Sequence, residues 1–183
     1  MTNVTNNVFL KLLRDVLVKS LADIGINNVL VRQNFPSKKT ETPNEPFVVF
    51  HRISDEPMHW QSRKAKVINS QKVIVHEQQF ITTLQVNAFM PRVAPENETI
   101  NDLSSEDLLR YVHMILQSQR MLDACKQAEL GLLPILNITP NWVQDEHDNW
   151  INEPSFNLEI TSKQQLVWNT PVVESGKIRI ERV

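Results

Sequence analysis

Apolar residues recur at spacings of three and four along residues 5–24, which is the pattern of an amphipathic helix. Asn6 or Asn7 can cap its first turn, and Gly25 stands where a left-handed residue would end it. The positions of the apolar stripe are Val8, Phe9, Leu12, Leu13, Val16, Leu17 and Leu21. We therefore predict an N-terminal helix that packs one face on a sheet.

Two further helices are predicted in the second half of the chain. The first begins at Ser104 or Ser105, whose hydroxyl groups suit an N-cap, and acidic residues follow in its first turn. The second covers about 118–130, where Gly131 is placed to end it. Cys125 lies on or beside the apolar face of this second helix. We interpret it as a buried small apolar residue and not as a nucleophile.

Several shorter segments have the composition or the period-two alternation of β-strands. They are residues 29–33, 47–50, 135–139, 156–160 and a last segment, 177–183. Residues 34–46 form a polar loop with three prolines between the first two of these strands. The polar run 144–149 is predicted to be the tip of a hairpin between the strands at 135–139 and 156–160.

The stretch from residue 51 to residue 90 carries the most unusual pattern. Residues 77–89 alternate with a period of two, but both faces carry apolar side chains. Such a strand lies at the centre of a sheet or reaches onto another subunit. Paired with residues 59–75, it gives an extended antiparallel β-hairpin, 59–89. We predict one α+β domain over residues 1–183, with a mainly antiparallel sheet, helices packed on one face and this long hairpin.

Composition narrows the possible functions. The chain has 19 Lys and Arg against 21 Asp and Glu, so it lacks the net basicity typical of nucleic-acid binding. Its 3 glycines lie far apart, which excludes a dinucleotide fingerprint and a P-loop. The single cysteine excludes an intrachain disulfide and cysteine-rich zinc sites, and indicates a reducing cytoplasm. We expect no signal peptide and no membrane span.

No set of residues has the spacing of a catalytic site. Asp145, His147 and Asp148 offer metal ligands, but neighbouring residues on a turn point in different directions, so a solvated tip is the better interpretation. No Gly-x-Ser-x-Gly motif is present. We predict no catalytic residue, metal or cofactor. A small metal-dependent hydrolase built on those three residues remains an alternative.

A basic stretch follows Trp60 and includes Arg63, Lys64 and Lys66. Cations beside an aromatic side chain can bind nucleic acid, so a nucleic-acid-binding adaptor is a second alternative. We favour two other interpretations. The cations protect an edge strand from aggregation, or they form one half of a charge-complementary interface between subunits.

The order of these features resembles the phage neck and tail terminator (tail completion) proteins, over nearly the whole chain. The matching pieces are the first helix, Val31-Arg-Gln33, Pro46-Phe-Val-Val-Phe50, Trp60, the strand Thr83-Leu-Gln-Val-Asn-Ala-Phe89, the helical region before Gly131, Pro140-Asn-Trp142 and Phe156-x-Leu-x-Ile160. Two features depart from the pattern. Met90-Pro91 follows the long strand where a glycine is expected, and the segment 166–176 has no counterpart.

The resemblance implies a structural protein of the virion and not an enzyme. Such a protein is assembled in the host cytoplasm as a homo-oligomeric ring, typically a hexamer. The ring caps the tail tube and joins it to the head–tail connector or adaptor, and genomic DNA passes through its lumen. Contacts between subunits are predicted to use the residues Trp60, Arg63, Lys64, Lys66, Phe80, Leu84, Val86 and Phe89.

Overall fold

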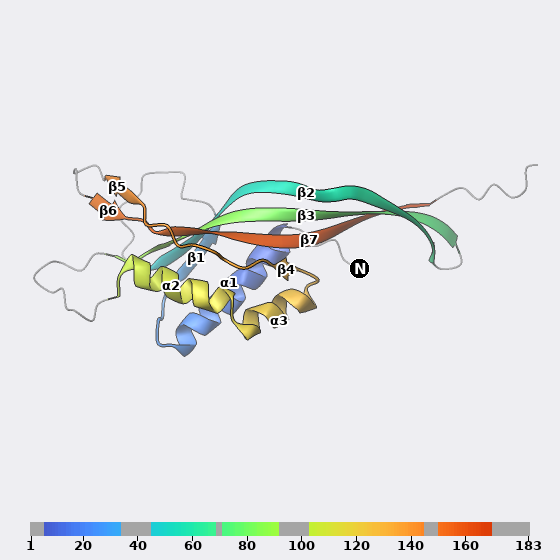
Figure 1. The fold of residues 1–183 in the computed structure, drawn as a ribbon. Helices are drawn as coiled ribbons and strands as arrows, with labels where there is room; N and C mark the ends of the chain where they lie inside the picture. Colours follow the sequence, from blue (N-terminus) through green and yellow to red (C-terminus); the bar gives the residue numbers. More distant parts are fainter. Residues whose placement is uncertain (1–5, 34–44, 69–70, 92–102, 145–149, 170–183) are drawn as a thin grey trace, which may run out of the picture.

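The computed structural model describes residues 6–33, 45–68, 71–91, 103–144 and 150–169. Its helices and strands follow in chain order (Figure 1). They are α1 (Asn6–Asp23), β1 (Leu30–Gln33), β2 (Phe47–Ile68), β3 (Gln71–Phe89), α2 (Ser105–Leu116), α3 (Gln119–Gln127), β4 (Gly131–Leu132), β5 (Trp142–Gln144), β6 (Trp150–Asn152) and β7 (Ser155–Asn169).

The α+β fold class predicted from the sequence is confirmed. Five strands form one sheet in the order β1-β2-β3-β7-β4, and β5 and β6 form a separate pair. In the larger sheet β1 runs parallel to β2, while the β2–β3, β3–β7 and β4–β7 pairings are antiparallel. The three helices lie on one side of this sheet (Figure 1).

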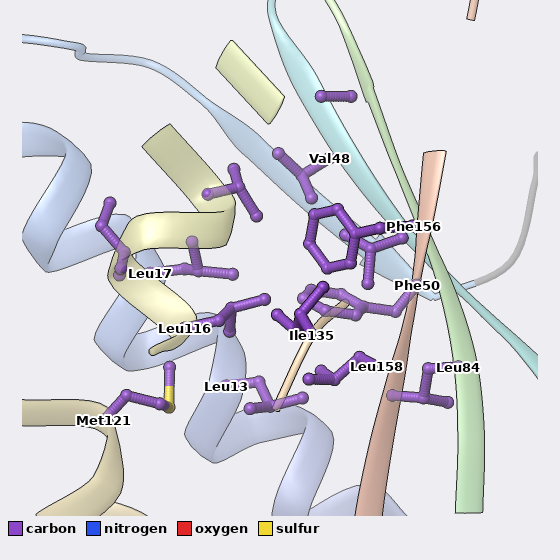
Figure 2. Packing of buried hydrophobic residues seen from close by; sticks show 14 of the residues in the cluster. Leu13, Leu17, Val48, Phe50, Leu84, Leu116, Met121, Ile135, Phe156 and Leu158 are labelled. Carbon is purple, nitrogen blue, oxygen red and sulfur yellow. The ribbon is translucent and has the colours of Figure 1, made fainter. Parts of the chain in front are cut away.

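The core forms where the apolar stripes of the helices meet one face of the sheet. Figure 2 shows Leu13 and Leu17 of α1 among side chains from the strands, including Phe50 and Phe156. All four of these side chains are at most 4% exposed. Burial of this kind contributes roughly 1.5–3 kcal/mol for each large apolar side chain. The apolar stripe predicted for the first helix therefore packs against the sheet, as its spacing indicated.

Local signals place most of the helix ends correctly. Gly25 has a φ of 88°, so it adopts the left-handed conformation predicted for the residue after α1. Ser104 is the N-cap of α2 and forms a capping box with Asp107. The prediction that Gly131 ends α3 is wrong. Glu129 takes the left-handed conformation there, with a φ of 58°, and Gly131 belongs to β4.

The capping box leads to a prediction about stability. Ser104→Ala is expected to destabilise the fold by about 1 kcal/mol, because the amide of Asp107 loses its side-chain acceptor.

The hydrogen bond from Ser104 is also the main reason why the pKa of Asp107 lies below its usual value. The ionised carboxyl therefore stabilises the fold above its unfolded-state pKa, and this contribution is lost as the pH falls. Urea unfolding followed by circular dichroism measures the loss. The exposed Gln119→Ala is the control, and an equal loss in both variants would contradict the cap.

The strand predicted at 135–139 is absent. Prolines precede and follow this segment, and a proline has no amide hydrogen for a ladder. One isolated bridge joins Thr139 to Ser155. The predicted hairpin around 144–149 is instead flanked by β5 and β6, which pair antiparallel. Residues 145–149, and the strand predicted at 177–183, lie outside the described residues.

The long hairpin is present, but its turn is not where the sequence pattern placed it. β2 and β3 pair antiparallel from Phe47↔Phe89 to Ile68↔Gln71. Residues 71–75, which we predicted in the first strand, therefore belong to the second, and the direction of the chain reverses between Ile68 and Gln71. On its other side β3 pairs with β7, which makes β3 the central strand. The hairpin thus becomes part of a three-stranded ribbon.

Candidate assembly interface

The three-stranded ribbon continues beyond the helices as an arm (Figure 1). We define the arm as residues 59–68 of β2, 73–80 of β3 and 162–169 of β7. β3 and β7 pair without a shift there, and β2 pairs with β3 from Ser62 onward. The buried cluster that contains the helices includes no residue of the arm. Its side chains therefore cover one another or remain open to a partner.

A bulge in β2 marks the start of the arm. Residues 59–61 lie opposite a single residue of β3, Gln78. His59 has a φ of 60° there. The side-chain amide of Gln78 donates to the carbonyls of Met58 at 2.9 Å and His59 at 3.0 Å. Trp60 is 96% exposed. The bulge thus holds a large aromatic side chain out in solvent on a backbone that Gln78 fixes.

A carboxylate surrounded by cations lies further along the arm. The Oε2 atom of Glu77 is 3.1 Å from Lys163 Nζ and 3.4 Å from Lys64 Nζ, and its Oε1 atom is 3.6 Å from Lys66 Nζ. Gln165 donates to Oε1 at 2.7 Å. Glu77 is only 7% exposed, although no helix covers the arm. Side chains from three strands, β2, β3 and the distant β7, therefore meet at one ion-pair cluster, which we call the Glu77 cluster.

The lysines of the Glu77 cluster act on its charge and on its packing. The hydrogen bond from Lys163 is the main cause that holds the pKa of Glu77 below its usual value, and the charge of Lys64 acts in the same direction. Lys64 and Lys66 stand opposite Val75 and Val73, which are 1% and 4% exposed. Lysine stems can cover apolar residues while the ammonium groups stay in water. Three lysines and one carboxylate leave this face of the arm positively charged.

Comparison with known families identifies the protein class. A family model described as E217 gateway protein gp29 matches residues 9–172, from α1 to beyond the end of β7. The chain belongs to this family. The resemblance to phage tail terminator (tail completion) proteins is thereby confirmed, and this gateway-family protein is a structural component of a phage tail.

Other comparisons add little to this assignment. No curated protein matches the gateway-family chain. A solved structure that resembles it is the sheath/tube terminator, in the extended state, of an extracellular contractile injection system, PVC. The identity is 12% and the TM-score 0.42, and the match covers 100% of this chain and 66% of that chain. The chain thus spans slightly less than two thirds of that terminator's length.

The structure places five predicted interface residues of the gateway-family protein on the arm, with Phe80 at its start. Trp60, Arg63, Lys64 and Lys66 are all exposed there. Glu77 was not predicted from the sequence as a member of this surface, although its carboxylate contacts Lys64, Lys66 and Lys163. One signal was available, because lysines two residues apart on a strand share one face and attract a carboxylate opposite them.

Phe80 and the remaining three predicted interface residues lie closer to the helices. Leu84 and Val86 are 1% and 0% exposed in the core of the same chain, so their side chains are unavailable to a second copy and we remove them from the interface. Phe80 is half-buried where the arm begins. Phe89, at the other end of β3, is half-buried against Phe47, with ring centroids 4.9 Å apart.

The alternative sites gain no support from the described residues of the gateway-family protein. Asp145, His147 and Asp148 lie outside them, and no three metal-ligating side chains come together within them. Burial raises the pKa of the Cys125 thiol, as suits a small core residue. An open groove between α1 and β1 is lined by basic and apolar residues such as Arg14 and Val31. No described helix is long and apolar enough to cross a membrane.

The Glu77 cluster leads to a pH-dependent prediction. Glu77→Gln is expected to destabilise the chain near neutral pH, because three lysines lose their shared carboxylate. The pKa of Glu77 is lowered in the folded protein, so its charge stabilises the fold above the unfolded value of 4.5, and this contribution is lost as the pH falls below it. The difference between wild type and variant should therefore shrink towards about pH 3.

Urea unfolding at several pH values measures this difference. The exposed Glu45→Gln, on the chain just before β2, is the matched control and should follow wild type at every pH. A Glu77→Gln variant as stable as wild type near neutral pH would show that the cluster contributes nothing to folding.

Proposed function

We propose that this protein is a tail terminator that forms a ring, caps the tail tube and joins it to the head–tail connector or adaptor. The family match over residues 9–172 is the observation that carries the proposal. The arm adds physical support, because an exposed tryptophan and a positively charged face outside the core are features of a surface that meets a partner.

The ring is proposed to be a homohexamer whose subunits contact one another through the arm. Ring subunits use heterologous contacts, in which two different surfaces of neighbouring copies meet and the rotation closes. In the proposal one of these surfaces contains Trp60, Arg63, Lys64 and Lys66. Phe80 lies at its margin, and Phe89 contributes from the other end of β3. We also propose that residues 1–183 fold as one domain, since α1, α2 and α3 share one buried cluster with the sheet.

The chain's charge suits passage of genomic DNA through the lumen. Tight DNA binding requires cations that neutralise phosphates, and the chain carries a net charge of −2. Two of its exposed cations, Lys64 and Lys66, are already paired with Glu77. We propose that the protein performs no catalysis, is assembled in the host cytoplasm and acts in the mature particle by its shape and contacts.

Electron microscopy of particles made without this protein tests the proposal. We expect unjoined heads and tails, or tails of uncontrolled length, and restoration when the wild-type chain is supplied from a plasmid. Supplying Leu84→Asp, which should not fold, is the matched control and should not restore the particles. Normal particles in the absence of the protein would contradict the proposed function.

A further inference from the structure

The face of the sheet opposite the helices, here called the outer face, can be assigned from the register. β3 and β7 pair without a shift from Val73 to Asn87, so alternate residues of β3 point to opposite faces along its whole length. Leu84 and Val86 belong to the helix-packed core. Thr83 therefore faces outward, and so does Glu77 in the arm. The outer face is thus one continuous surface that includes the Glu77 cluster.

The charges on the outer face are separated along the strands. Beside the helix-covered half, Glu56 stands opposite Ile81 and Glu159 stands opposite Thr83. Both glutamates are exposed, and neither forms an ion pair with another described residue. In the arm the same face carries three lysines around Glu77. Arg32 of β1 is level with Val49 and also lies on this face, at the sheet edge. The end with the two glutamates is therefore net negative, and the arm is net positive.

The two ends cannot meet within one chain. Lys64 is level with Val75, and Val75 is level with Val167 of β7, eight residues beyond Glu159. At 3.3 Å per residue this is about 26 Å along the strands. Since the strands are fixed in one sheet, Lys64 can pair with Glu159 only in another copy.

We infer that the outer face of one copy receives the arm of a second copy, with Lys64 and Lys66 against Glu56 and Glu159. The inference deepens the proposed function, on which it rests, because it names the surface that the arm contacts in the ring. Charge complementarity of this kind fixes the register of two surfaces and disfavours other arrangements. Trp60, in the bulge four residues before Lys64, supplies the aromatic anchor that such contacts use.

A second copy fits this surface better than nucleic acid does. DNA would match the lysines, but it would leave Val167, which is 51% exposed on the same face, beside a charged backbone. The two glutamates would repel phosphate groups further along the face. The Glu77 cluster also favours a protein partner, because it holds the lysines in fixed positions and so reduces the entropy that binding would cost.

Charge reversal tests the inference by sedimentation of the full-length protein. K64E/K66E gives both ends of the outer face the same negative sign, and E56K/E159K gives both ends a positive sign. Each variant alone is expected to associate at least about tenfold more weakly than wild type. An equimolar mixture of the two variants should recover association, because each end again meets its opposite. Failure of the mixture to recover, with both variants folded by circular dichroism, would overturn the inference.

A cysteine pair gives an independent readout that needs no new charge next to Glu77. In K64C/E159C the two thiols are too far apart within one chain for a short bismaleimide, so any cross-link joins two copies. Wild type is the control for Cys125, which is buried with a raised thiol pKa and should not react. K126C/E159C, with Lys126 exposed on α3, is the matched control and should give no cross-link.

The outcomes separate this inference from the proposed function. Cross-links between copies of K64C/E159C, and none in the two controls, support the contact. A wild-type chain that stays monomeric at its highest soluble concentration, together with no cross-link in K64C/E159C, overturns the contact. Salt-dependent binding of duplex DNA that is lost in K64E/K66E would also overturn it in favour of nucleic acid. The proposed function fails separately, in the particle experiment.

Discussion

The Leu84→Asp variant is expected not to fold. Leu84 is 1% exposed in β3, the central strand of the sheet, with Leu158 of β7 opposite it and α1 packed on the same cluster. A carboxylate there would be buried without a partner, at a cost above about 4 kcal/mol. That is most of the stability of an ordinary domain, which is about 5–15 kcal/mol. Far-ultraviolet circular dichroism and the cooperativity of urea unfolding measure the result.

Val167→Asp is the matched control for this substitution. It introduces the same carboxylate on the same sheet, at a position 51% exposed in the arm, and should leave the fold intact. A Leu84→Asp variant that unfolds cooperatively at the wild-type urea concentration would mean that β3 does not pack against the helices as described.

Unlike Leu84→Asp, the Trp60→Ala variant is expected to fold normally but to associate more weakly with other copies. Trp60 is 96% exposed, so its removal should change the free energy of unfolding by less than about 0.5 kcal/mol. An aromatic anchor at an interface typically contributes at least about 2 kcal/mol, which is roughly a thirtyfold weaker association. Sedimentation equilibrium measures the association and urea unfolding measures the fold.

Val67→Ala controls for the loss of apolar surface on the same strand. Val67 is 68% exposed on β2 but lies away from the bulge, and a smaller effect on association is expected. If Trp60→Ala associates as strongly as wild type, Trp60 is not an anchor, and the arm contact would depend on its charges alone.

Local signals in the sequence predicted the helices because those signals act within a few residues. Ser104 reveals the start of α2 through its hydroxyl, and Gly25 reveals the end of α1 through its freedom to adopt a positive φ. The failure at Gly131 has the same basis. Glycine is the usual helix-ending residue but not an obligatory one, and Glu129 accepts the left-handed conformation two residues earlier.

Alternation predicted the long strands but could not assign their faces. The pattern at 77–89 places apolar residues on both sides of β3, and the residue types do not tell which side the helices cover. Leu84 and Val86 were therefore assigned to an interface, although the helices of the same chain bury them. The reversal of the chain between Ile68 and Gln71 was also missed, because the sequence there has none of the strongest hairpin signals.

The Glu77 cluster could not be predicted from the sequence, for a different reason. Its members come from residues 64, 66, 77, 163 and 165, and they meet only when three strands pair in one particular register. A shift of one residue would move Glu77 to the other face of the sheet, away from every lysine. The register between strands that are far apart in the chain cannot be predicted from a single sequence.

The pairing of β3 with β7 also implies an order of events during folding. At the base of the ribbon Asn87 joins Ser155, and at the tip Val73 joins Asn169, so the chain enclosed by each pair lengthens steadily towards the tip. Closing a longer loop costs more entropy. Only at the base do contacts with the helices offset this cost, because the helices pack there and not on the arm. Pairing is therefore expected to begin next to the helices and to propagate outward, which makes the tip of the arm the last part to form and the first to open.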